Sequence, residues 1–486
     1  MPERPLFIDN AIDNALSRRE LLGRGGMGFS SLALAYLLGD EARAERATRG
    51  HDLTPKSPHF DGPAKAVIQL VQTGGPSQMD LFDPKPELTR LDGKTFGEET
   101  EPLQPGSEEN KLLGSPFKFQ SYGKCGMELS ELIPYVGEVA DDVSLIRPQV
   151  STHNNHTEAI VTLATGFMNP GRPVLGSWVS YALGTENRDL PAYVVLRDPA
   201  GHATSGGLMA KSEWLPAIYG GTEFNSQGAP VHNLKPTTPR PAGTERNSLD
   251  LIARLNEKHR KRYPFEPDLE ARIQNYELAA RMQLSATDVL DVSQESQKTR
   301  ELYGLHIDQT KSYGTRCLMA RRLVEAGVRF VQVFVGAGQP WDQHNDLRSG
   351  LMSMCYGNSP SIGLIKDLKQ RGLLDSTVVI WAGEFGRLPV SQETPGSARD
   401  GRDHNKYAGT LWIAGGGFKR GFIYGKTDAV GFRAVENKFS MPDMFATVAH
   451  TLGLDHNRVS FTHQGHLETM TDAKVSDAKV HHELLM

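Results

Sequence analysis

The sequence has few cysteines and no excess of positive charge. Its three cysteines, Cys125, Cys317 and Cys355, are too far apart for a disulfide framework or for the usual zinc-binding spacings. We expect all three to be small buried hydrophobic residues. The net charge is −5, and no basic stripe stands out, which argues against nucleic acid as a partner.

Long apolar runs are also missing, so we expect no transmembrane segment in the mature chain. Near the N-terminus, paired Arg18 and Arg19 precede a short glycine-rich apolar stretch at 27–38 and a small-residue site at 42–44. This pattern is typical of a twin-arginine signal, so residues 1–44 predict export to the periplasm or cell envelope. The alternative is an ordinary amphipathic helix that begins with two arginines.

Short apolar runs rich in valine and isoleucine recur along the rest of the chain. They are nearly continuous in apolar character, as expected of strands that are buried on both faces. Helical patterns lead into two of them, with Gly327 and Gly372 placed to end the helices. The runs lie at 64–75, 142–150, 192–198, 328–338, 376–387 and 409–418. We therefore predict an α/β domain over 60–486, with a mostly parallel central sheet sandwiched by helices.

One segment, 222–300, departs from this alternation of strands and helices. It begins as a loop rich in proline, glycine and asparagine and continues as charged amphipathic helical patterns. We expect a loop and helical insertion within the α/β domain, and not a separate catalytic domain.

Carboxylate and imidazole side chains collect where the predicted strands end. Open α/β sheets bind ligands beyond the carboxyl ends of their strands, so these side chains are expected at one edge. Carboxylate with imidazole suits zinc, manganese or a similar divalent ion, and two such ions can clamp an in-line displacement. Each residue alone has a simpler explanation as a loop or turn residue, but their coincidence favours a shared site. The candidates are Asp80 and Asp83, His153 and His156, Asp342 and His344, Glu384, and Asp403 and His404.

Three cations near these segments are candidate partners for an anion: Arg387, Arg402 and Lys406. Arginine suits bidentate contact with an oxyanion. Each could equally be a surface cation.

Several motifs together resemble a known family. The motifs are SRRELL, GGPSQMDLFDPKP, HTEAIVTLATG, WDQH, GEFGR and GRDHNKYAGTLWIAGGG. From about residue 60 to the end, the chain is similar to an exported bacterial family, domain of unknown function 1501. That family is grouped with the alkaline phosphatase and sulfatase superfamily. The resemblance implies that superfamily's α/β fold, with metal ions at the carboxyl edge of the sheet.

The resemblance also implies ligands at particular positions. Asp342 and His344 match the acidic and histidine ligands after a late strand, and His404 matches the late histidine ligand. Glu384 falls where the superfamily has an aspartate. The aspartate that normally ends the first strand is missing, since Gln72 or Thr73 stands there, and Asp80 in the following loop is the candidate replacement.

Sulfatases keep their nucleophilic cysteine nine residues before the threonine of a Thr-Gly pair. In this chain the pair is Thr165-Gly166, and the nucleophile position holds His156. His156 would then be a metal ligand, a general base or an unusual nucleophile, since neutral imidazole can act in each way. Thr157 is the nearest hydroxyl alternative.

The leading hypothesis is a metal-dependent hydrolase of sulfate or phosphate esters outside the cytoplasm, acting on an anionic small molecule or glycan. The metal would be divalent zinc, calcium or manganese, held by Asp342, His344, Glu384 and His404, with Asp80 as a further candidate. The alternative is a non-catalytic metal- or ligand-binding protein that keeps the sulfatase-like fold; the missing first-strand aspartate and cysteine favour it. A third interpretation is a lyase or isomerase that uses the same metal site.

Overall fold

A computed structural model describes most of the chain. The described residues are 52–227, 244–262, 288–393 and 400–486, together with 273, 276–278 and 281–282. The predicted export signal at 1–44 lies outside them, as do parts of the predicted 222–300 insertion. Among the described residues, no helix combines the length and the apolar character that a membrane span needs.

An eight-stranded sheet lies at the centre of the molecule, with the strand order β12-β4-β11-β8-β1-β7-β5-β6. Every strand except β11 runs in the same direction, and β11 is antiparallel to both of its neighbours. The strands are β1 (Ala66–Val71), β4 (Val143–Gln149), β5 (Tyr193–Leu196), β6 (Thr222–Phe224), β7 (Phe330–Phe334), β8 (Thr377–Ala382), β11 (Gly409–Ala414) and β12 (Phe422–Tyr424). The predicted mostly parallel sheet is confirmed, and each of the six apolar runs contains one strand of this sheet.

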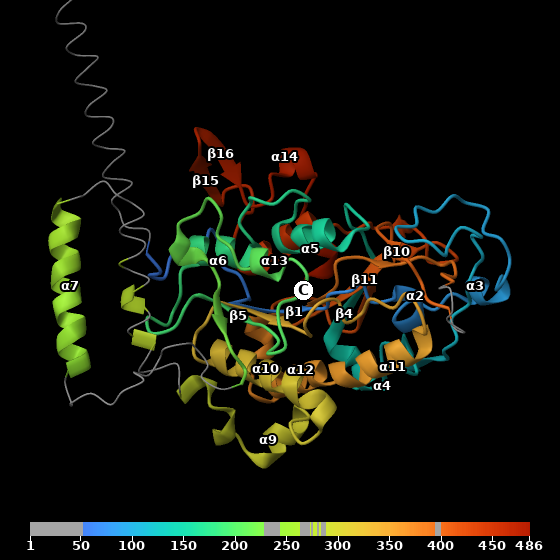
Figure 1. Cartoon of the computed structure of the whole chain (residues 1–486), viewed down its shortest axis with the longest axis horizontal. Coiled ribbons are helices and arrows are strands. Elements are labelled where there is room, and N and C mark those ends of the chain that lie inside the picture. The colour runs from blue at the N-terminus through green and yellow to red at the C-terminus, as the bar shows by residue number, and fades with distance from the viewer. Residues whose placement is uncertain are drawn as a thin grey trace, which may run out of the picture.

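Helices cover both faces of this sheet (Figure 1). The first strand shows why its sequence is apolar throughout: Val67 and Val71 face one hydrophobic cluster, while Ile68 and Leu70 face the other. One face is covered by α5 (His156–Thr165), α6 (Leu175–Leu183) and α13 (Met441–Thr451), and the other by α4 (Pro134–Gly137), α10 (Asp308–Glu325), α11 (Leu347–Asn358) and α12 (Pro360–Gln370). The two clusters are the apolar layers between sheet and helices.

Two helix ends follow the predicted pattern. Gly327 ends α10 before β7, and Gly372 ends α12 before β8, with φ of +90° and +70°. This left-handed conformation suits glycine because it has no Cβ. The two short connections therefore return the chain directly from helix to sheet.

Several short helices and two-stranded pairs lie outside the central sheet. They are the helices α2 (Gln78–Leu81), α3 (Pro86–Arg90), α9 (Gln297–Leu302) and α14 (Ala473–Ser476), and the two-stranded pairs β2 (Phe119–Tyr122) with β3 (Met127–Ser130), β9 (Gly386–Arg387) with β10 (His404–Asn405), β13 (Lys426–Thr427) with β14 (Ala434–Glu436), and β15 (Ser460–His463) with β16 (His466–Thr469). Cys317 and Cys355 are buried as expected, but Cys125 is exposed in the β2–β3 turn, so the expectation for that residue was wrong.

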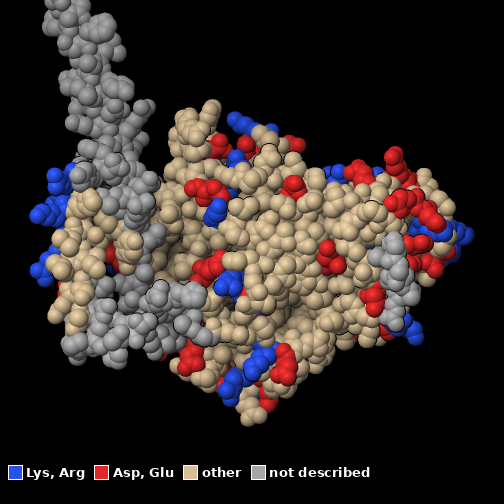
Figure 2. Space-filling model, viewed as in Figure 1, with Lys and Arg blue, Asp and Glu red and all other residues tan. Residues whose placement is uncertain are grey.

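One helix stands away from the layers. The helix α7 (Thr244–Arg262) falls within the predicted insertion segment and lies beside the sheet and its covering helices, at the left of Figure 1. It exposes Leu251, Ile252 and Leu255. Figure 2 shows lysine and arginine side chains along α7 and acidic side chains gathered toward the opposite end of the molecule. Basic side chains also lie among the acidic ones at that end, so charges of both signs are mixed there.

We predict that Gly327→Ala lowers the free energy of unfolding by about 1 kcal/mol, the typical cost of a left-handed conformation for a residue with a Cβ. Space is not the cause, because the nearest atoms to an added Cβ, in Asn187 and Glu186, lie at 3.5 Å. Urea unfolding of the variant measures the loss. Gly97→Ala is the matched control, because Gly97 has no positive φ and no atom within 4 Å of a Cβ. An equal effect of both substitutions would contradict this explanation.

Candidate metal centre

The candidate site lies at the carboxyl edge of the parallel strands. His156 begins α5, and Asn155 caps that helix by accepting the Thr157 N–H at 2.9 Å. Asp342 and His344 lie between β7 and α11, and His404 lies in β10, just before β11. Because β11 runs against the other strands, the segment before it reaches the same edge at which the others end.

A close approach of two backbone segments helps to bring these residues together. Gly74 follows β1 with φ +114°, and a Cβ there would lie 2.5 Å from the Trp341 nitrogen and 2.6 Å from the Asp342 nitrogen. Only glycine allows the chain after β1 to lie directly against the turn that carries Asp342. A glycine at position 74 is thus needed for the backbone packing that positions Asp342.

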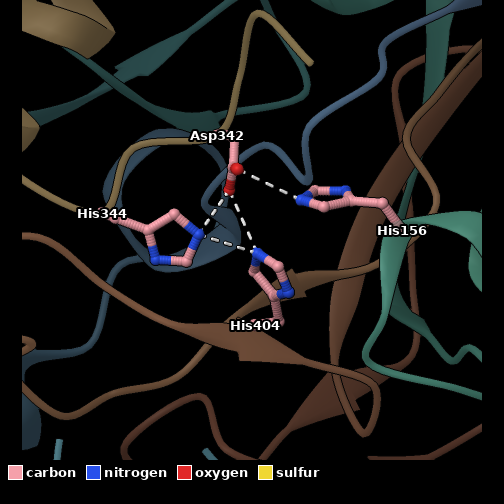
Figure 3. Close-up of side chains that lie close together, drawn as sticks. All are labelled: His156, Asp342, His344 and His404. Atoms are coloured by element: carbon pink, nitrogen blue, oxygen red, sulfur yellow. Dashed lines mark hydrogen bonds and ion pairs between the residues drawn. The ribbon is translucent and has the colours of Figure 1, made fainter. Parts of the chain in front are cut away.

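Three histidines and one aspartate converge on a single point (Figure 3). The Asp342 Oδ1 atom lies 2.8 Å from His344 Nε2 and 3.0 Å from His404 Nε2, and Asp342 Oδ2 lies 3.2 Å from His156 Nε2. The His344 and His404 Nε2 atoms are 3.0 Å apart. One ligand atom from each of the four residues falls within 4.8 Å of every other.

The opposite ring nitrogen of each histidine is held by an oxygen atom. His156 Nδ1 lies 2.7 Å from Glu384 Oε1, His344 Nδ1 lies 2.6 Å from Gln392 Oε1, and His404 Nδ1 lies 2.7 Å from the Asn154 carbonyl. Carboxylate and carbonyl oxygens only accept, so each Nδ1 must donate its hydrogen. In the neutral ring, the lone pair is then on Nε2, the atom that faces the cluster.

This arrangement fits a divalent cation. Metal-binding histidines commonly donate their second ring N–H to a carboxylate or carbonyl, which fixes the tautomer. His156 Nε2 is buried and has no hydrogen bond, although Asp342 Oδ2 is near it. Two lone pairs that face each other at 3.0 Å, beside a carboxylate, need a positive charge between them, and either a proton or a metal ion can supply it.

Asp342 is strongly held in its ionised form. Burial alone would raise its pKa, but the close contacts with His156, His344 and His404 and the charge of Arg387 hold the pKa well below its usual range. Arg387 Nη2 donates to Asp342 Oδ1 at 2.7 Å. The carboxylate is therefore an anionic ligand at any physiological pH.

The same surroundings affect two of the histidines in opposite directions. Burial would lower the pKa of His156, but its contacts with Asp342 and Glu384 raise that pKa overall. Burial, the charge of Arg387 and the nearby His156 lower the pKa of His404 to about 4, despite the contact with the Asp342 carboxylate, which acts in the opposite direction. His404 is thus neutral near pH 7, the form in which imidazole binds metals.

The structure gives three other predicted site residues different surroundings. Glu384 is fully buried behind His156, and its Oε1 also accepts the Gly74 N–H at 2.8 Å. Asp80 pairs with Arg402 at 2.8 Å and accepts from the Ser77 hydroxyl, outside the four-residue cluster. Thr157 is exposed on the first turn of α5 and is also outside the cluster.

Arg387 and Arg402 are not surface cations, which was the alternative to a role as anion partners. Both are buried, because Arg387 donates to the Gly75 and Arg402 carbonyls and to Asp342, and Arg402 donates to Asp80. Lys406 pairs with Glu101 at 2.7 Å.

The sequence interpretation did not single out three residues that contact the ligand histidines or surround them: Asn154, Gln392 and Gln104. A glutamine or asparagine in a loop has no spacing pattern that would identify such contacts. From the sequence, His153 could be either a loop residue or a site residue. Its Nδ1 accepts the Asn155 N–H at 2.9 Å and so stabilises the turn before α5.

Together, the sheet and this cluster define an α/β protein with a histidine-rich site of metal-binding type. The chain belongs to the family described as protein of unknown function (DUF1501), whose model matches residues 64–485. No curated protein matches the sequence.

Solved structures similar to this chain include sulfatases and alkaline phosphatases, as the motifs led us to expect. The PsFucS1 sulfatase from Pseudoalteromonas sp. is 12% identical, with 81% of this chain and 68% of that chain covered and a TM-score of 0.34. Alkaline phosphatase from the Antarctic bacterium TAB5 is 8% identical, with 81% and 99% covered and a TM-score of 0.34.

We predict that Asp80→Asn reduces stability without removing metal. It leaves the fully buried Arg402 without its charged partner, and breaking a buried ion pair typically costs about 3–5 kcal/mol. Urea unfolding measures the stability, and metal analysis of the folded fraction measures binding. Loss of metal at unchanged stability would instead make Asp80 a ligand.

Proposed function

We propose that His156, Asp342, His344 and His404 bind one divalent metal ion and that the protein hydrolyses anionic esters there. The observation that carries the proposal is the shared direction of the histidines: three Nε2 atoms face one carboxylate while three oxygens hold the Nδ1 atoms. Hydrogen bonding within an ordinary polar cluster does not require all three rings to share this orientation.

The ligand set favours zinc or manganese over calcium. Calcium takes oxygen ligands, usually six to eight, whereas imidazole with carboxylate suits zinc and other transition metals. With three imidazoles and one carboxylate, the cluster has too few oxygens for calcium. Zinc and manganese remain as candidates, and metal analysis separates them.

Hydrolysis is the reaction class that this site supports best. A bound divalent ion supplies Lewis acidity, which polarises a phosphoryl or sulfuryl oxygen and makes water more acidic. The protein's own contribution is to hold the ligands: Arg387 fixes Asp342, and Glu384 fixes the ring of His156. In this proposal His156 is a ligand, so neither it nor Thr157 needs to act as a nucleophile.

The substrate class follows from the same site and from the family resemblance. We take it to be a sulfate or phosphate ester of a small molecule or glycan, outside the cytoplasm if residues 1–44 direct export. A binding protein without turnover is the second candidate. It is favoured by the exposure of Thr157, the hydroxyl residue next to His156 in the sequence, which is not a member of the four-residue cluster.

We predict about one zinc or manganese ion per chain in purified protein, and its loss in His404→Ala. Glu384→Gln should weaken metal binding by about 10–100-fold, since it alters the group that orients a ligand histidine. Inductively coupled plasma mass spectrometry measures the metal content, and competition with a chromogenic chelator measures the affinity. Full metal content in His404→Ala would contradict the ligand assignment.

We also predict that the metal-loaded protein hydrolyses at least one of an aryl sulfate, a phosphate monoester and a phosphodiester. Chelator or His404→Ala should abolish turnover. His202→Ala is the histidine control, because this side chain is half exposed and lies outside the cluster. Metal binding without turnover on any of the three esters would favour the binding protein instead.

A further inference from the structure

A loop segment crosses the candidate metal centre and is tied to its ligands. We call residues 101–106 the cover segment. Asp403, fully buried beside His404, accepts two consecutive backbone N–H groups of this segment: Leu103 at 2.7 Å and Gln104 at 2.8 Å. The acidic neighbour of His404 therefore anchors the cover segment.

The cover segment also contacts two of the three groups that orient the histidine rings. Gln392, which accepts from His344, donates its amide to the Pro105 carbonyl at 3.1 Å. Asn154, whose carbonyl accepts from His404, donates its side-chain amide to the Glu101 carbonyl at 2.9 Å. Hydrogen bonds to Asp403, Gln392 and Asn154 thus fix the cover segment relative to the histidines of the cluster.

One side chain of the cover segment reaches the cluster itself. The amide nitrogen of Gln104 lies 3.1 Å from His344 Nε2. The direction of this hydrogen bond follows from the other contacts: the Gln392 amide nitrogen is used by Pro105, so its oxygen faces His344 Nδ1 and takes that hydrogen. His344 Nε2 is then the acceptor, and Gln104 is the donor.

Metal binding would remove this acceptor, because the same Nε2 lone pair would bind the ion. The Gln104 amide would keep its place, since its backbone is held by Asp403, and its N–H would need another partner next to the ligand atoms. The Gln104 side chain is exposed, so a molecule arriving from solvent can reach it.

We propose that Gln104 is an anion-positioning residue: once the metal centre is loaded, its amide donates a hydrogen bond to an oxygen of a phosphate or sulfate group held at the cluster. This inference rests on the proposed metal centre and adds a side chain that selects for the oxyanion. Two features make it suitable: it is a neutral donor, and it approaches the ligand set from the solvent side.

The test measures binding of inorganic phosphate, and separately of inorganic sulfate, to the full chain by isothermal titration calorimetry. The protein is first loaded with whichever of zinc or manganese the wild type retains, and metal content is confirmed in each sample. The variants are Gln104→Ala, Gln104→Glu and the matched control Leu103→Ala, which changes a neighbouring exposed side chain but keeps the backbone N–H.

We expect Gln104→Ala to weaken binding of the anion about 10-fold or more, as for loss of one hydrogen bond to a charged oxygen. Gln104→Glu should weaken it further through like-charge repulsion, and Leu103→Ala should leave it unchanged. Metal affinity should be unchanged or higher in Gln104→Ala, because the amide no longer competes for His344.

Three results would overturn the proposal: equal anion affinity in Gln104→Ala and Leu103→Ala, no binding of either anion by the metal-loaded wild type, or loss of metal in Gln104→Ala. The last result would make Gln104 a structural part of the metal centre. Absence of metal from the wild type would refute the metal centre and this inference together. The metal analysis reveals that failure before any anion is added.

Discussion

The site depends on one electrostatic constraint: three imidazole lone pairs and a carboxylate are directed at the same small space. His344 and His404 bring their Nε2 atoms to 3.0 Å from each other, and both lie about as close to Asp342. Such a group is stable only with positive charge between its members. Either a proton on an imidazole or a metal ion can supply that charge, and the contacts of His156 with Asp342 and Glu384 raise its pKa. A divalent ion would satisfy all four ligands at once.

The rest of the fold can be understood as the support for this arrangement. The turn that holds Asp342 and His344 follows β7, one of the seven parallel strands. His404 lies just before the antiparallel strand β11 and so reaches the same edge. Arg387 is buried, and its guanidinium donates a hydrogen bond to Asp342 in this turn. Glu384, Gln392 and Asn154 then set the direction of each ring. In the proposed metal centre these contacts would hold the ligands in position before a metal ion binds, which favours tight and specific binding.

The sequence predicted the sheet well because strands buried on both faces are apolar throughout, and glycines mark the ends of α10 and α12. It also predicted all four members of the cluster, since polar residues after parallel strands meet at one edge. It could not predict which of the candidate residues join the cluster and which pair with other side chains. Glu384 lies behind His156, and Asp80 pairs with Arg402, which is far from it in the sequence; only the three-dimensional packing decides such pairings.

The position of the missing first-strand aspartate shows the same limit. Gln72 is fully buried, and its amide oxygen accepts from Trp341 at 3.0 Å and from Asn358 at 2.7 Å. Its side chain thus belongs to a hydrogen-bond network with Asn358, the last residue of α11, and Trp341 in the turn before that helix. The sequence comparison shows only that Gln72 or Thr73 replaces an aspartate at this position. The structure shows which residues Gln72 contacts instead.

X-ray absorption at the edge of the bound metal tests the central claim most directly, because it counts the ligands around the ion. The account predicts four protein ligands at about 2.0–2.2 Å, all nitrogen or oxygen, with the outer-shell scattering of three imidazole rings. A shell containing sulfur, or one made only of oxygen without imidazole scattering, would contradict it.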